Sequence, residues 1–84
     1  MSQLACVVVT FNPDLDYFKT VIAKILKNEV LIYIVDNGSE NINDWSSYLS
    51  PSIVLISLEE NVGIARAQNI GIQRAFNCLW HDYT

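Results

Sequence analysis

Residues 30–39 read VLIYIVDNGS, an apolar run that changes abruptly into a polar turn. The unbroken run predicts a strand over Val30–Val35 that is buried on both faces, because a half-exposed strand would alternate apolar and polar residues. Asp36-Asn37-Gly38-Ser39 is a dense turn signal that ends this strand. Strands buried on both faces are typical of parallel sheets covered by helices, so the stretch favours an α/β fold.

The segments on either side repeat the pattern. Leu4–Thr10 reads LACVVVT and Ile53–Leu58 reads IVLISL, which predicts two more buried strands. In residues 15–26 apolar side chains recur at steps of three and four, which predicts a helix. Asn12 is the expected N-cap of this helix and Pro13 its first residue, while the lysines mark its solvent side.

The second half of the chain continues the alternation. A short helix capped by Asp44 is expected before the third strand, and a longer helix over Ile64–Phe76 after it. In the tail, residues 77–84, the apolar Leu79, Trp80 and Tyr83 indicate an incipient strand. The order strand, helix, strand, short helix, strand, helix predicts a layered α/β fold with a parallel sheet.

The composition fits one small globular domain. The chain has 84 residues, of which 51% are hydrophobic and 17% charged, with a formal net charge of −4. The apolar fraction excludes intrinsic disorder, and the acidic balance argues against binding to nucleic acid or to an anionic membrane surface. We expect neither a membrane-spanning helix nor a secretory signal. Cys6 and Cys78 lie far apart without metal-binding spacing, which favours reduced thiols in a cytoplasmic protein.

Candidate site residues gather where the expected strands end, which is where ligands of parallel α/β sheets usually bind. Thr10-Phe11-Asn12 offers a hydroxyl, a ring and an amide for a nucleobase, and Asp36 a carboxylate for a ribose. Asn61-Val62-Gly63 leads into a helix whose N-terminus attracts phosphate. Taken singly, each group is more often a cap, a turn or a loop without a ligand. Asn69 is suited either to bracing a loop or to facing solvent.

Several familiar motifs are missing from the sequence. There is no GxGxxG after the first strand, no GxxxxGK[ST], and no credible Ser/His/Asp set. These absences argue against a nicotinamide-binding domain, a P-loop nucleotide hydrolase and a serine hydrolase. A receiver-like or flavodoxin-like domain is also disfavoured, because a receiver needs an acidic pair where this chain has Thr10-Phe11-Asn12.

Taken together, three segments resemble the N-terminal part of family 2 glycosyltransferases, especially the rhamnosyltransferase-like members. They are VVVTFNPD from Val7, IVDNGS from Ile34, and ENVGIA from Glu60 running on to AQNIGI. The resemblance as a whole extends over nearly all of the chain. The resemblance implies a GT-A fold, here a three-layer, Rossmann-like half-domain with a short parallel sheet.

The resemblance also implies a nucleotide-binding site. Its residues would be Thr10, Phe11, Asn12, Asp36, Asn37, Asn61, Gly63 and Asn69. The donor would be a nucleotide-diphosphate sugar, and UDP and dTDP types fit equally. Family members continue into an Asp-x-Asp motif that holds Mg²⁺ or Mn²⁺, whereas this chain stops at Asp82-Tyr83-Thr84. We therefore expect residues 1–84 to be the donor-binding portion of a truncated glycosyltransferase, without metal or catalytic base and inactive alone.

Truncation has a further consequence for the sheet. In the family, the first strand lies between the second strand and one that this chain lacks, so its edge would be open. We expect a homodimer through that edge or through residues 79–84. The alternative function is a non-catalytic α/β association module with a vestigial nucleotide site. A full-length relative could also act at the inner face of the membrane.

Overall fold

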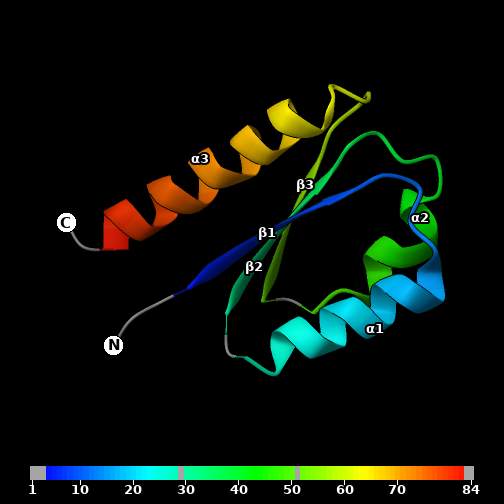
Figure 1. Cartoon of the computed structure of the whole chain (residues 1–84), viewed down its shortest axis with the longest axis horizontal. Helices are drawn as coiled ribbons and strands as arrows, with labels where there is room; N and C mark the ends of the chain where they lie inside the picture. The colour runs from blue at the N-terminus through cyan, green and yellow to red at the C-terminus, as the bar shows by residue number, and fades with distance from the viewer. Residues whose placement is uncertain (1–3, 29, 51, 83–84) are drawn as a thin grey trace.

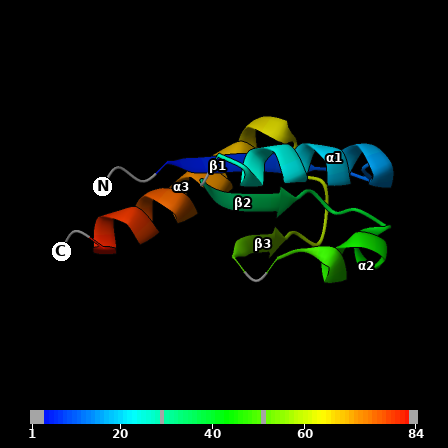
Figure 2. The same cartoon turned by 90° about the horizontal axis from the view of Figure 1, so that it is seen from below.

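A central parallel sheet organises the chain, as the apolar runs predict. In the computed structural model, which describes residues 4–82 except 29 and 51, β1 (Ala5–Thr10), β2 (Leu31–Asp36) and β3 (Ile53–Ser57) pair in the order β1-β2-β3 (Figures 1 and 2). The register pairs Thr10 with Asp36 and Asp36 with Ser57. The three carboxyl ends therefore meet at one edge of the sheet, where the candidate residues were expected.

One face of the sheet is covered by α1 (Leu15–Leu26), α2 (Ile42–Trp45) and the short 3-10 helix η1 (Ser46–Tyr48). The core on this side consists of Phe18, Ile22, Ile32, Ile34, Trp45 and Ile53. The rings of Phe18 and Trp45 meet edge to face, with centroids 5.0 Å apart. Burial of these side chains from helices and strands alike fixes α1 on the sheet.

The opposite face is covered by α3 (Ile64–Asp82), so that the sheet lies between two helical layers (Figure 1). Ala67, Gly71 and Ala75 form its buried stripe. A Cβ on Gly71 would lie 2.4 Å from Val7 Cγ1 and 2.8 Å from Val35 Cγ2. The helix can approach β1 and β2 this closely only because Gly71 has no side chain.

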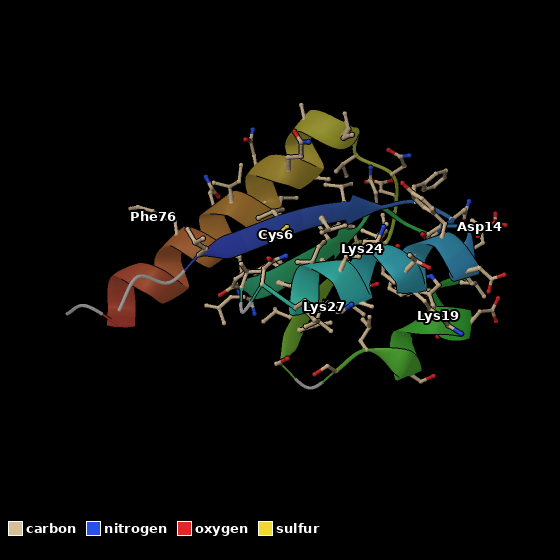
Figure 3. All side chains as sticks on the ribbon, turned by 60° about the horizontal axis from the view of Figure 1, so that its bottom comes forward. Cys6, Asp14, Lys19, Lys24, Lys27 and Phe76 are labelled. Atoms are coloured by element: carbon tan, nitrogen blue, oxygen red, sulfur yellow. The ribbon has the colours of Figure 1, made fainter. Side chains whose placement is uncertain are left out.

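The start of α1 differs from the expectation. Asp14, not Asn12, is the N-cap, and its Oδ1 accepts a hydrogen bond from the Tyr17 N–H over 3.0 Å. Both residue types make good caps, but the Asn12 side chain is engaged elsewhere in the fold. Figure 3 shows Asp14 at the start of α1 and Lys19, Lys24 and Lys27 along it. These lysines are exposed, as expected.

Two other boundaries also differ. The short helix α2 begins at Ile42 with Asn41 as its N-cap, so Asp44 lies within it and does not cap it. The expected strand in the tail is wrong as far as Asp82, because α3 continues through these residues. No glycine or proline follows Gly71 to break the helix. Tyr83 and Thr84 lie outside the described residues.

Candidate functional site

The buried carboxylate of Asp36 joins the ends of two strands. Thr10 Oγ1 donates a hydrogen bond to Asp36 Oδ1 over 2.8 Å. The turn after β2 adds two donors, the Ser39 N–H to Oδ2 over 2.8 Å and the Ser39 Oγ to Oδ1 over 2.5 Å. Asp36 is 0% exposed, and a buried carboxylate needs such donors to remain stable. We refer to Thr10, Asp36 and Ser39 as the carboxylate knot.

Asn12 fastens the loop after β1 to the same turn. Its backbone N–H donates to Ser39 Oγ over 2.7 Å, and its Oδ1 accepts from the Glu40 N–H over 2.8 Å. Its φ of 44° lies in the left-handed region, which asparagine tolerates better than most residues. Phe11 remains 52% exposed just before this fastened residue. The loop therefore combines an anchored backbone with an accessible aromatic ring.

A second network ties the loop after β3 to the turn after β2. Asn37 Nδ2 donates to Asn61 Oδ1 over 3.0 Å, and Asn37 Oδ1 accepts from the Val62 N–H over 2.8 Å. Asn61 Oδ1 also accepts from the Gly63 N–H over 2.8 Å. We refer to Asn37, Asn61 and these two backbone N–H groups as the amide clasp. Because the Asn37 N–H donates to the Thr10 carbonyl oxygen over 2.8 Å, the clasp is continuous with the knot.

Gly38 lets the backbones of these two loops touch. A Cβ at this position would lie 2.7 Å from the Glu60 carbonyl carbon and 2.9 Å from the Asn61 nitrogen. Its φ of 82° also favours glycine. The glycine of the DNGS turn is thus required both by the backbone conformation and by the close approach of residues 60–61.

The charges placed near this edge are mostly acidic. Glu40 follows the knot, and Glu59 and Glu60 precede Asn61; all three are exposed. The first turn of α3 has no acidic residue and carries the exposed Arg66. The loop around residues 59–61 therefore carries exposed negative charge, whereas Arg66 adds a positive charge in the first turn of α3.

The described residues of this edge do not bring metal-ligating side chains together. Among the described residues, no group of three or more His, Cys, Asp or Glu side chains is placed to hold a metal ion. Both oxygens of Asp36 are already engaged in hydrogen bonds within the knot. The Mg²⁺ or Mn²⁺ that the resemblance implies for a full-length relative therefore does not fit these residues.

A groove also lies away from this edge. It has a volume of about 340 Å³ and lies between α1 and the α2–η1 segment, lined mainly by apolar side chains such as Phe18, Leu26 and Leu49. None of the residues expected to bind nucleotide lines it. None of the described helices is long and apolar enough to cross a membrane.

Comparison with known proteins identifies the family of the chain. The family model "Glycosyl transferase family 2" matches residues 5–77. The chain belongs to this family. A similar curated protein is the dTDP-rhamnosyl transferase RfbF of Shigella flexneri, which is 34% identical over 73 residues. The match covers 86% of this chain and 24% of that protein. No solved structure gives a significant match.

Membership of glycosyl transferase family 2 confirms the resemblance seen in the three sequence segments, and the sheet between two helical layers confirms the fold class. The structure gathers the expected nucleotide-binding residues at one edge, with the exception of Asn69. Thr10, Asp36 and Asn37 are buried there, whereas Phe11, Asn12, Asn61 and Gly63 are exposed. Asn69 is exposed on α3, and its side chain makes no hydrogen bond with the described residues.

Sequence reasoning missed the part played by Ser39. Its hydroxyl donates to Asp36 and accepts from the Asn12 N–H, so it connects the two loops at the centre of the site. The position of Ser39 directly after Asp36-Asn37-Gly38 in the family segment was an available signal, because serine in such turns commonly bonds nearby backbone groups.

Proposed function

We propose that this chain binds the nucleotide part of a nucleotide-diphosphate sugar at the carboxyl edge of its sheet. The observation that carries the proposal is the hydrogen-bonding of the loops after β1, β2 and β3 to one another through the knot and the clasp. Loops that are already fixed need not be ordered when a ligand binds, which favours affinity. Family membership supplies the ligand class.

The exposed residues of the edge are the proposed contacts. Phe11 would stack on the base, and the amides of Asn12 and Asn61 would bond its polar atoms, with Gly63 allowing close approach. Thr10, Asp36 and Asn37 would hold these contacts in place. Asn69, on α3, stays a proposed brace for the loop beside the base. The name of the Shigella protein favours a dTDP-linked donor such as dTDP-rhamnose, with UDP as the alternative carrier.

We propose that sugar transfer itself requires more than these residues. Transfer needs stabilisation of the leaving diphosphate and activation of the acceptor hydroxyl. The described residues supply no acidic cluster for the first task, and the buried carboxylate of Asp36 is engaged within the fold. The matched segment would thus be the donor-binding portion of a longer glycosyltransferase domain. Turnover by the 84-residue chain with nucleotide sugars and Mg²⁺ would contradict this proposal.

Isothermal titration calorimetry tests the nucleotide proposal directly. We expect dTDP and UDP to bind with dissociation constants in the micromolar to millimolar range, and ADP to bind more weakly, because the edge is proposed to read a pyrimidine. Equal binding of all three nucleotides would show that the edge does not distinguish a pyrimidine base from a purine base. If none of the three nucleotides binds at millimolar concentration, the nucleotide proposal is wrong and association remains as the candidate function.

Association is a second candidate, favoured by the open edge of β1. Within residues 4–82, excluding 29 and 51, no strand pairs with the edge of β1 that faces away from β2. Residues 4–10 include no charged side chain, and Leu4 is 66% exposed. Unprotected edges of this kind template pairing with another strand. We propose a homodimer through β1, which sedimentation at increasing protein concentration would detect and a constant monomer mass would contradict.

A further inference from the structure

Asn37-Gly38 is the one place in the sequence where a glycine follows an asparagine. An asparagine at such a place is chemically labile, because the backbone nitrogen of the next residue can attack its side-chain carbonyl carbon. A glycine leaves that nitrogen uncovered by a side chain and lets the backbone bring the two atoms together. The other asparagines precede larger residues, namely proline, glutamate, isoleucine, aspartate, valine or cysteine.

The fold holds both of the groups that would react. Asn37 is 3% exposed, and its side chain accepts from the Val62 N–H and donates to Asn61 Oδ1. The backbone of residues 60–61 occupies the space beside Gly38 where a side chain would begin. Attack turns the Asn37 carbonyl carbon from planar to tetrahedral and releases its nitrogen, and the two hydrogen bonds resist both changes. The amide clasp therefore protects Asn37 as long as it stays closed.

We propose that Asn37 is a modification site, at which the chain loses the side-chain amide by reaction with its own backbone when the clasp opens. The Gly38 nitrogen loses its proton and bonds to Asn37 Cγ, the bond from Cγ to Nδ2 breaks, and ammonia leaves with the proton. Water then opens the succinimide ring. Cleavage of the ring at Cγ gives aspartate. Cleavage at the backbone carbonyl carbon gives isoaspartate, in which the main chain runs through the former side chain.

Neither product can rebuild the clasp. Aspartate has only acceptors where Asn37 Nδ2 donates, so two oxygens would face each other at the contact with Asn61. Isoaspartate lengthens the main chain beside Gly38, where the backbone of residues 60–61 leaves no space. An opening that leads to reaction therefore unfastens the loops after β2 and β3 permanently. The reaction needs no ligand, so it is independent of the proposed nucleotide binding.

Peptide mass spectrometry of the full chain, incubated at mildly alkaline pH, measures the rate of conversion at Asn37. We expect the folded wild-type chain to convert at least about tenfold more slowly than the same chain unfolded in urea. Asn61→Ala removes the acceptor of Asn37 Nδ2 and of the Gly63 N–H, and it should raise the rate in the folded chain about tenfold. Asn43→Ala, at an exposed position of α2, is the matched control and should leave the rate unchanged.

A second measurement tests the consequence for the loops. Converted chains carry an added carboxylate, so ion-exchange chromatography separates them from unconverted chains. Amide hydrogen exchange is then compared at Val62, whose N–H donates to Asn37 Oδ1 in the clasp. We expect at least about tenfold faster exchange at Val62 in chains that carry isoaspartate.

Each contrary result refutes a stated part of the proposal. Absence of conversion in urea refutes the modification site, and equal rates in the folded and unfolded chain refute protection by the fold. A wild-type rate in folded Asn61→Ala refutes the clasp as the protecting contact. If Asn61→Ala does not fold, the wild-type chain in urea below its unfolding transition replaces it, and an unchanged rate there has the same meaning. Unchanged exchange at Val62 in converted chains refutes the permanent loss of the clasp.

Discussion

Replacing Thr10 by Val removes one donor from the Asp36 carboxylate while almost preserving side-chain shape. The lost bond is 2.8 Å long and buried, and Asp36 keeps its two bonds from Ser39. A hydrogen bond to a charged group contributes about 1.5–3 kcal/mol, so we expect the free energy of unfolding to fall by about 2 kcal/mol. For a domain of this size that corresponds to a fall in Tm of roughly 8–16 °C.

The assay is urea unfolding followed by circular dichroism, with Thr20→Val as the matched control. Thr20 is exposed on α1, where its hydroxyl donates to the Asp16 carbonyl oxygen. Its loss should change the unfolding free energy by no more than about 0.5 kcal/mol. Thr10→Ser keeps the hydroxyl and should lose only about 1 kcal/mol, from one buried methyl group. If Thr10→Val and Thr20→Val are equally stable, the carboxylate knot does not hold the strand ends.

Three further predictions concern the helix contact, the aromatic ring and the open edge. Gly71→Ala should destabilise the chain by about 1–3 kcal/mol in urea unfolding, since the new methyl would overlap Val7 and Val35, despite the higher helix propensity of alanine. Phe11→Ala should weaken dTDP binding about tenfold in calorimetry while Tm changes little, because the ring is half exposed; unchanged affinity would exclude stacking. Ala5→Lys puts a charge on the β1 edge and should shift sedimentation toward monomer, and a dimer of unchanged strength would place the interface elsewhere.

Elements could be predicted from the sequence where the local residue pattern and the tertiary packing favour the same secondary structure. An apolar run such as Val30–Val35 suits only a strand covered on both faces, so the sheet was predictable. The meeting of Thr10 with Asp36 followed, because parallel strands share their carboxyl edge. That Gly38 touches residues 60–61 was not predictable, since nothing in a turn motif specifies which distant loop packs against it.

The errors arose where two residues fit the same local role. Asn12 and Asp14 are both suitable caps for α1, and the choice is made by a contact of Asn12 with Glu40, 28 residues away. The Ser39 hydroxyl donates to Asp36 and also accepts from the Asn12 N–H. The second contact was not predictable, because Asn12 lies in a loop that is distant in sequence. In the tail, Leu79 and Trp80 suit a strand or a helix equally, and the helix already begun at Ile64 simply continues.

We propose above that the carboxyl edge of the sheet binds a pyrimidine nucleotide. The most direct test of this proposal is a nuclear magnetic resonance titration of the ¹⁵N-labelled chain with dTDP, followed residue by residue. We expect saturable shifts confined to the loops at Phe11-Asn12, at Asn37-Gly38 and at 61–63, with no shifts in the groove between α1 and α2. Shifts centred on that groove, or no shifts at millimolar dTDP, would contradict the proposal.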